Sequence, residues 1–165
     1  MKNPKTKGNG FERRVAKILS DWAGVRFMRT PASGAIHNFK DKRVVSDIVA
    51  PLSVGNFPFS IECKKVECSW ELSSIIEGTS QTLKDHWKQC VQDAEQENLI
   101  PLLVFNKNFR EIYAILKQSD LEKTKIILEN RLEVFLSGGI PLVIFRLKDF
   151  LAALSCAKLV SLKLC

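Results

Sequence analysis

The sequence predicts an α/β fold in which helices pack on the faces of a central β-sheet. Two long segments, 10–24 and 80–98, carry apolar residues at three-and-four spacing, which is typical of amphipathic helices. Short apolar runs rich in Val, Ile and Phe lie between and after them, which is typical of strands. The order helix, strands, helix, strands therefore favours one sheet covered by helices.

The N-terminal half is expected to contain one helix and three strands. The helix carries an apolar stripe that begins at Phe11, and the pattern stops at Gly24. The basic segment before it, residues 1–9, is expected to be a flexible arm. A short turn at 52–56 contains Gly-Asn, so we expect the strands on either side of it to form a hairpin. The expected strands are 25–30, 43–51 and 57–67.

The C-terminal half begins with a segment, 68–79, whose pattern favours neither helix nor strand. The helix at 80–98 follows, and its apolar stripe consists of Leu83, Trp87, Cys90, Val91 and Ala94. The next two apolar runs are expected to be strands that pair antiparallel. The segment 120–136 is mixed, and helix is favoured for part of it. The expected strands of this half are 99–106, 110–116 and 139–147, and a short helix is expected at 148–155.

The length and the charge of the chain restrict its class. Its 165 residues suit one domain, and its net charge of +7 favours a polyanionic partner such as nucleic acid, although a solvated basic surface explains the charge equally well. No apolar run reaches the roughly 20 residues of a membrane-spanning helix. The polar N-terminus does not resemble a secretory signal, so we expect a location inside a cell.

The cysteines and histidines do not form a recognisable framework. The five cysteines are odd in number and irregular in spacing, which argues against both a disulfide scaffold and a zinc site. Cys63 falls within an apolar strand and is expected to pack as a small hydrophobic residue. His37 and His86 lack a zinc-binding spacing, and no Gly-rich phosphate-binding loop is present. These features are consistent with a reducing, cytoplasmic environment.

Three charged side chains occupy related positions on the second and third expected strands. Asp47 lies in the middle of one, and Glu62 and Lys64 lie two residues apart in the next. Residues i and i+2 of a strand share a face, so Glu62 and Lys64 project together. A hairpin would place Asp47 next to Glu62 on that face. Because two adjoining carboxylates are costly to bury, this pattern predicts that Asp47 and Glu62 share a divalent cation.

The predicted cation site has the composition of a phosphodiester-hydrolysing centre. Mg²⁺ prefers a few carboxylates, with waters and substrate phosphates as its other ligands, and it activates a bound water. Lys64 would orient that water or stabilise the charge that develops on the phosphoryl group. The alternative interpretation is an edge-strand charge at Asp47 and an ion pair of little energetic value between Glu62 and Lys64.

The segments "SDIVAP" and "IECKK" together resemble the signature of the PD-(D/E)XK nuclease superfamily, in which an acidic residue on one strand precedes Glu-X-Lys on the next. Ser46 stands where the signature has proline. The resemblance implies a restriction-endonuclease-like fold, with a mixed central β-sheet flanked by helices. It also implies metal-dependent cleavage of DNA, with Mg²⁺ as the cofactor and Mn²⁺ as an expected substitute.

The segment "GNGFERRVAKIL", followed by "RTPASG", is similar to the start of the archaeal-type and phage Holliday junction resolvases. This likeness implies that Glu12 is a metal-site carboxylate, acting directly or through water. It implies that Arg29 contacts a phosphate near the scissile bond, and that Ser33 and Gly34 belong to a loop that closes on the DNA. Taken alone, Glu12 is better explained as an ordinary first-turn helix acid, favoured by the helix dipole. The likeness covers about residues 8–66, and residues from about 107 to 165 are expected to extend the same domain.

The expected function is therefore a Mg²⁺-dependent, structure-selective DNA endonuclease that resolves four-way junctions in recombination or repair. Two symmetric cuts require a C2 homodimer. Further DNA-binding candidates are Arg13, Lys65 and Gln89. Two alternatives remain open: a restriction-type or repair-type nuclease or nickase that acts on duplex DNA, and a basic DNA-binding module without catalysis.

Overall fold

The computed structural model describes residues 4–30, 46–55, 57–66, 71–107, 111–136 and 138–154, and for residues 4–8, 72 and 107 it describes the backbone only. Its helical segments are α1 (Pro4–Ala23), η2 (Leu52–Val54), α2 (Leu72–Ile76), α3 (Gln81–Glu97), α4 (Gln118–Thr124) and α5 (Leu147–Ala153). Its strands are β1 (Met28–Arg29), β2 (Ile48–Val49), β3 (Phe59–Val66), β4 (Ile100–Lys107), β5 (Ile112–Lys117), β6 (Arg131–Leu136) and β7 (Ile140–Arg146).

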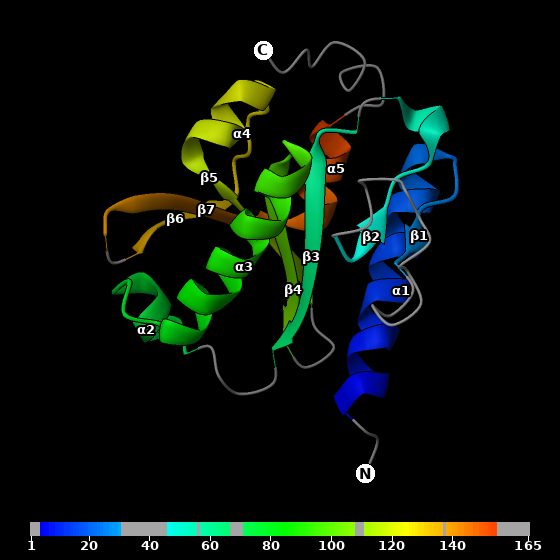
Figure 1. The fold of residues 1–165 in the computed structure, drawn as a ribbon. Helices are drawn as coiled ribbons and strands as arrows, with labels where there is room; N and C mark the ends of the chain where they lie inside the picture. The colour runs from blue at the N-terminus through cyan, green and yellow to red at the C-terminus, as the bar shows by residue number, and fades with distance from the viewer. Residues whose placement is uncertain are drawn as a thin grey trace.

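These strands form one seven-stranded sheet in the order β1-β2-β3-β4-β5-β7-β6. Only β3 and β4 run parallel among the described strands, and α3 makes the crossover between them. The remaining neighbours are antiparallel, so the sheet is mixed. Figure 1 shows β3 in the middle of the molecule, between α3 and α1. The predicted α/β class with a mixed sheet flanked by helices is confirmed.

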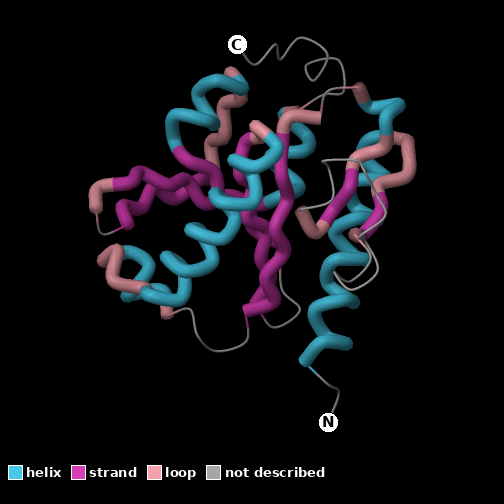
Figure 2. The backbone as a smooth tube through the Cα atoms, in the orientation of Figure 1, coloured by secondary structure: helices cyan, strands magenta, loops and turns pink. Residues whose placement is uncertain are grey.

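Each face of the sheet has its own apolar core, because side chains alternate between the two faces of a strand. The first core lies under α1 and α5 and contains Ile61 and Cys63 of β3. The second lies under α2 and α3 and contains Leu103 and Phe105 of β4. Figure 2 shows the helices outside the strands in this arrangement. Cys63 is 8% exposed, as expected for a small hydrophobic residue.

The predicted helices at both ends of the sequence are present, but α1 starts earlier than expected. It begins at Pro4, so residues 4–9 continue the helix where the sequence predicted a flexible arm. Proline is compatible with the first turn of a helix, since the N–H that it lacks would have no partner there. Trp22 of α1 donates a hydrogen bond of 3.1 Å to the carbonyl of Leu154, which joins the N-terminal helix to the end of α5.

The helix α3 has the capping residues that its sequence provides. Ser80 precedes it and accepts a hydrogen bond from the backbone N–H of Leu83, and Asn98 ends it in the left-handed conformation with a φ of 55°. The predicted stripe is buried at Leu83, Trp87, Cys90 and Ala94, and Val91 packs beside it. This orientation turns the opposite side of α3 toward solvent.

The segments that the sequence left open are divided between helix and strand. Residues 68–79 supply the short helix α2 at Leu72–Ile76. Within 120–136, the helix α4 covers only the beginning, residues 125–130 are neither helix nor strand, and residues 131–136 form the edge strand β6. None of the helices in the described part combines the length and the apolar composition that a bilayer crossing requires.

Candidate active site

The hairpin of β2 and β3 places Asp47 beside Glu62. Ile48 is paired with Ile61, and the backbone N–H of Asp47 donates to the carbonyl of Ile61 at 2.9 Å. Asp47 therefore lies just before β2 and not in the middle of a longer strand. Its side chain turns back onto β3, where Oδ2 accepts a hydrogen bond of 2.8 Å from the backbone N–H of Cys63.

Glu62 and Lys64 form an ion pair on β3. The distance from Lys64 Nζ to Glu62 Oε1 is 2.6 Å. The side chain of Lys64 is 22% exposed and that of Glu62 is 7% exposed. The shared face follows from the two-residue period of the strand, as the sequence predicted. Because β3 lies between β2 and β4, the pair lies inside the sheet and not on an outer edge, where such pairs contribute little.

The ionised form of both carboxyl groups is disfavoured. Burial raises the pKa of Asp47 to about 7, with the charge of Glu62 as the second cause and the hydrogen bond from Cys63 opposing them. Burial also raises the pKa of Glu62, against the hydrogen bond and the charge of Lys64. The site therefore holds more negative charge than its own cation balances, which is the condition that a bound divalent cation relieves.

The donor set fits a cation that takes only part of its ligands from protein. Among the described residues, no group of three or more His, Cys, Asp and Glu side chains is arranged to hold a metal ion. Asp47 and Glu62 supply two carboxylates, which is the number that Mg²⁺ commonly takes when waters and substrate phosphates complete its octahedron.

Glu12 and Arg29 form an ion pair with each other. Arg29 Nε donates to Glu12 Oε2, and Arg29 Nη2 donates to Asn9 Oδ1 at 3.0 Å. The side chain of Glu12 is 16% exposed and that of Arg29 is 18% exposed. The charge of Glu12 contributes to the raised pKa of both Asp47 and Glu62, so Glu12 lies within electrostatic reach of them. The structure thus pairs the predicted metal-site acid with the predicted phosphate-binding cation.

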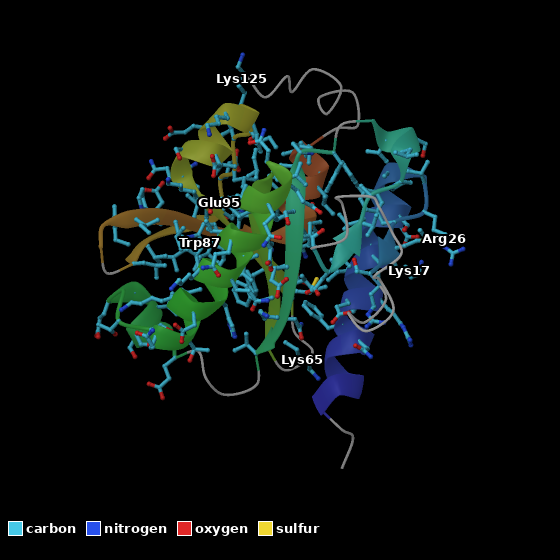
Figure 3. All side chains as sticks on the ribbon, viewed as in Figure 1. Lys17, Arg26, Lys65, Trp87, Glu95 and Lys125 are labelled. Atoms are coloured by element: carbon cyan, nitrogen blue, oxygen red, sulfur yellow. The ribbon has the colours of Figure 1, made fainter. Side chains whose placement is uncertain are left out.

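The other predicted residues divide into three groups. Gln89 on α3 accepts a hydrogen bond of 2.9 Å from Lys64 Nζ, so it belongs to the site. Arg13 is exposed on α1, and Lys65 lies on the opposite face of β3 from Lys64 because neighbours alternate. Figure 3 places Lys65 at the end of β3, whereas Lys125 projects beyond α4 at the far side of the molecule. Ser33 and Gly34 lie outside the described residues.

Comparison with known proteins gives one family and one curated relative. Residues 3–159 match the model of a family described as "Phage putative PDDEXK endonuclease". The chain belongs to this family. It is also similar to Protein D14 of Escherichia phage T5, with 30% identity over 118 residues, which cover 69% of this chain and 71% of that protein. No solved structure matches the chain.

Membership of the PDDEXK endonuclease family establishes the general class of the chemistry. The protein is a nuclease, its substrate is DNA, and nucleases with this signature generally use divalent metal ions. The match spans both halves of the sheet, from α1 to α5, so the strands after β4 belong to the region that the family shares.

Sequence reasoning missed one residue of this candidate site. Asp93 on α3 accepts a hydrogen bond from the side chain of Gln89, and its charge contributes to the raised pKa of Glu62. Gln89 and Asp93 are four residues apart, a spacing that makes them neighbours on a helix. The spacing alone does not identify them, because Gln81 and Asp85 form the same pair on α3, with a hydrogen bond of 2.8 Å.

Proposed function

We propose that the protein is a Mg²⁺-dependent endonuclease that hydrolyses phosphodiester bonds in branched DNA, with four-way junctions as the substrate. The observation that carries the catalytic part is the adjacency of Asp47 and Glu62, fixed by the hydrogen bond from Cys63. These two carboxylates would hold the cation, and Glu12 would assist directly or through water. Mn²⁺ is expected to replace Mg²⁺.

The cation, when bound, supplies a Lewis acid for the phosphoryl oxygen and lowers the pKa of a water molecule. The residues of the chain carry out the remaining tasks. Lys64, held by Glu62, donates a hydrogen bond to the attacking water or to a phosphoryl oxygen. Water attacks the phosphorus in line with the leaving 3′ oxygen. Arg29 lies beside Glu12, where a partly buried guanidinium is suited to a neighbouring phosphate of the same strand.

The preference for junctions is supported by the likeness of residues 8–66 to the resolvases, together with the net charge of +7. Symmetric resolution of a junction needs two active sites, so we propose a C2 homodimer. Two apolar segments are candidates for its interface: the surface around Phe135, which is 60% exposed on the edge strand β6, and the C-terminal segment 150–165, most of which lies outside the described residues.

The proposal is tested with a labelled four-way junction and a matched linear duplex, each incubated with Mg²⁺ or with EDTA. We expect Mg²⁺-dependent cleavage of the junction by the unmodified protein and none by Asp47→Ala or Glu62→Ala. Asp21→Ala is the matched control, because Asp21 is an exposed carboxylate that pairs with Lys17 on the surface of α1. Cleavage by the Asp47 and Glu62 variants at the unmodified rate would reject the proposal.

The same experiment separates the alternative functions. Equal cleavage of duplex and junction would indicate a restriction-type or repair-type nuclease, or a nickase if only one strand is cut. Binding of DNA without metal-dependent cleavage would indicate a non-catalytic module. The oligomeric state is measured by analytical ultracentrifugation with and without the junction, and a monomer in both conditions would remove the basis for paired cuts.

A further inference from the structure

A chain of polar contacts leads from Lys64 on β3 to Asp93 on α3. Lys64 Nζ donates to Gln89 Oε1 at 2.9 Å. The side chain of Gln89 in turn hydrogen-bonds to the Asp93 carboxylate, one helical turn farther along. Gln89 is therefore held between a cation that donates and a carboxylate that accepts.

This arrangement selects one orientation of the Gln89 side chain. The oxygen and the NH₂ group of a glutamine amide have almost the same shape, so either can face a given neighbour. An ionised aspartate only accepts hydrogen bonds, and it therefore binds the NH₂ group. Asp93 thus leaves Oε1 of Gln89 for the ammonium of Lys64. The reversed amide would place its N–H donors against those of Lys64.

The orientation of Gln89 also determines where Lys64 can act. A lysine ammonium has three N–H donors, and within the described residues Glu62 and Gln89 accept from two of them. One acceptor lies on β3 and the other on α3, so together they fix the position of Nζ and the direction of the remaining N–H. Loss of the acceptor on α3 would let the ammonium rotate about its contact with Glu62.

We propose that Asp93 is a positioning residue of the nuclease site, which acts through Gln89 to orient Lys64. This inference rests on the proposed function, since it assumes that Lys64 acts on the attacking water or the phosphate. The location of Asp93 agrees with it, because Asp93 lies close enough to Glu62 for its charge to be felt there. The relay therefore extends from the helix surface to the carboxylate pair.

The activity test is a double-mutant cycle of Asp93→Ala and Gln89→Ala. We expect Asp93→Ala alone to lower kcat about tenfold, while KM for DNA and the Mg²⁺ concentration for half-maximal rate stay unchanged. In the Gln89→Ala background, Asp93→Ala should have no further effect, because the relay is already broken. Asp93→Glu keeps a side chain that only accepts hydrogen bonds and should restore most of the rate.

The matched control is Asp85→Ala. It removes the same Gln-to-Asp pair, at the same spacing and on the same helix, but at Gln81 and Asp85. Alanine favours helix, so both alanine variants are expected to keep α3 intact. We expect the rate of Asp85→Ala to equal that of the unmodified protein.

Three outcomes would overturn the inference. The first is an unchanged kcat in Asp93→Ala. The second is an equal loss with and without Gln89, which would mean that Asp93 acts independently of the amide. The third is a loss that a higher Mg²⁺ concentration restores, which would make Asp93 a determinant of metal affinity.

A spectroscopic test does not depend on cleavage. The ¹⁵N resonances of the Gln89 amide and the Lys64 ammonium should both move in Asp93→Ala and stay in place in Asp85→Ala. Unmoved resonances would refute the relay whatever the activity. Resonances that move as expected in a protein that cleaves no DNA, or whose Glu62→Ala variant is fully active, would instead refute the proposed function and leave the relay standing.

Discussion

The backbone N–H of Cys63, the residue that follows Glu62 in the chain, donates a hydrogen bond of 2.8 Å to the Asp47 carboxylate. Asp47 cannot turn away from Glu62 without losing this bond. The two carboxylates are therefore held close together although the charge of each raises the free energy of the other. The site is assembled at a cost to the folded protein, and this cost can be measured.

The stability of the metal-free protein should depend on pH through Asp47. Its pKa rises from 3.8 to about 7 on folding. Between those values the folded state keeps a proton that the unfolded chain loses, so this group makes stability fall as the pH rises. Asp47→Asn removes the effect. We expect the variant to be more stable than the unmodified protein by on the order of 2 kcal/mol at pH 8, and equally stable near pH 4.

Urea unfolding in EDTA at the two pH values measures this difference. Asp21→Asn serves as the control, since Asp21 is 64% exposed and pairs on the surface. A difference between Asp47→Asn and the unmodified protein that is the same at both pH values would contradict the electrostatic origin of the cost.

Divalent cations should stabilise the protein in proportion to their binding. A concentration one hundred times the Kd adds about 2.7 kcal/mol to the free energy of unfolding. We expect Mg²⁺ and Mn²⁺ to raise Tm, EDTA to reverse the rise, and Glu62→Gln to abolish it. Glu133→Gln is the control, because Glu133 is an exposed carboxylate on β6, which forms the edge of the sheet opposite to β1. An equal rise of Tm in Glu62→Gln would place the ion elsewhere.

Arg29 should contribute to DNA binding through a phosphate. Arg29→Ala is expected to weaken binding about equally for all DNA sequences and to reduce the slope of log K against log salt by about one. Fluorescence anisotropy between 50 and 200 mM salt, about the range over which such slopes are resolved, provides the measurement. Arg131→Ala is the control, since Arg131 lies on β6 and pairs with Glu133. An unchanged slope in Arg29→Ala would mean that Arg29 serves only to hold Glu12.

Phe150 should matter for stability, whereas Phe135 should not. Phe150 on α5 is 0% exposed, and its ring lies 5.6 Å from that of Phe59 on β3. We expect Phe150→Ala to cost about 3–5 kcal/mol, and Phe135→Ala, at a side chain 60% exposed, to cost under about 0.5 kcal/mol. Urea unfolding measures both. A separate unfolding transition at low urea concentration, in Phe150→Ala or in Phe135→Ala, would contradict the proposal that residues 1–165 form one domain.

The strands of the candidate site could be predicted because their determinants are local. Two apolar runs separated by a short Gly-containing turn form a hairpin, and the two-residue period then places Glu62 and Lys64 on one face. The contacts that surround these residues depend on how the helices are rotated against the sheet. A short stretch of sequence does not determine that rotation. The pairing of Glu12 with Arg29 and the contact of Gln89 with Lys64 are of this kind.

The errors of the sequence analysis also have physical causes. The basic, polar composition of residues 1–9 suggested an arm, where α1 in fact continues back to Pro4. In the segment 120–136, the expected helix in part of it agrees with α4, and the strand β6 at its end is the part that the sequence left unassigned. Residues 131–136 alternate between the two faces of the sheet because they pair with β7 along their whole length.

The parallel pairing of β3 with β4 has a consequence for how the protein is made on the ribosome. A hairpin can form as soon as its two strands have emerged, but a parallel neighbour must wait for the crossover helix and the strand beyond it. The parallel neighbour of β3 ends at Lys107, so the β3–β4 pairing cannot be completed until the chain through residue 107 has emerged. A nascent chain carries its acidic residues before the fold has brought them together. The ability to cut DNA is therefore expected only once most of the polypeptide is complete.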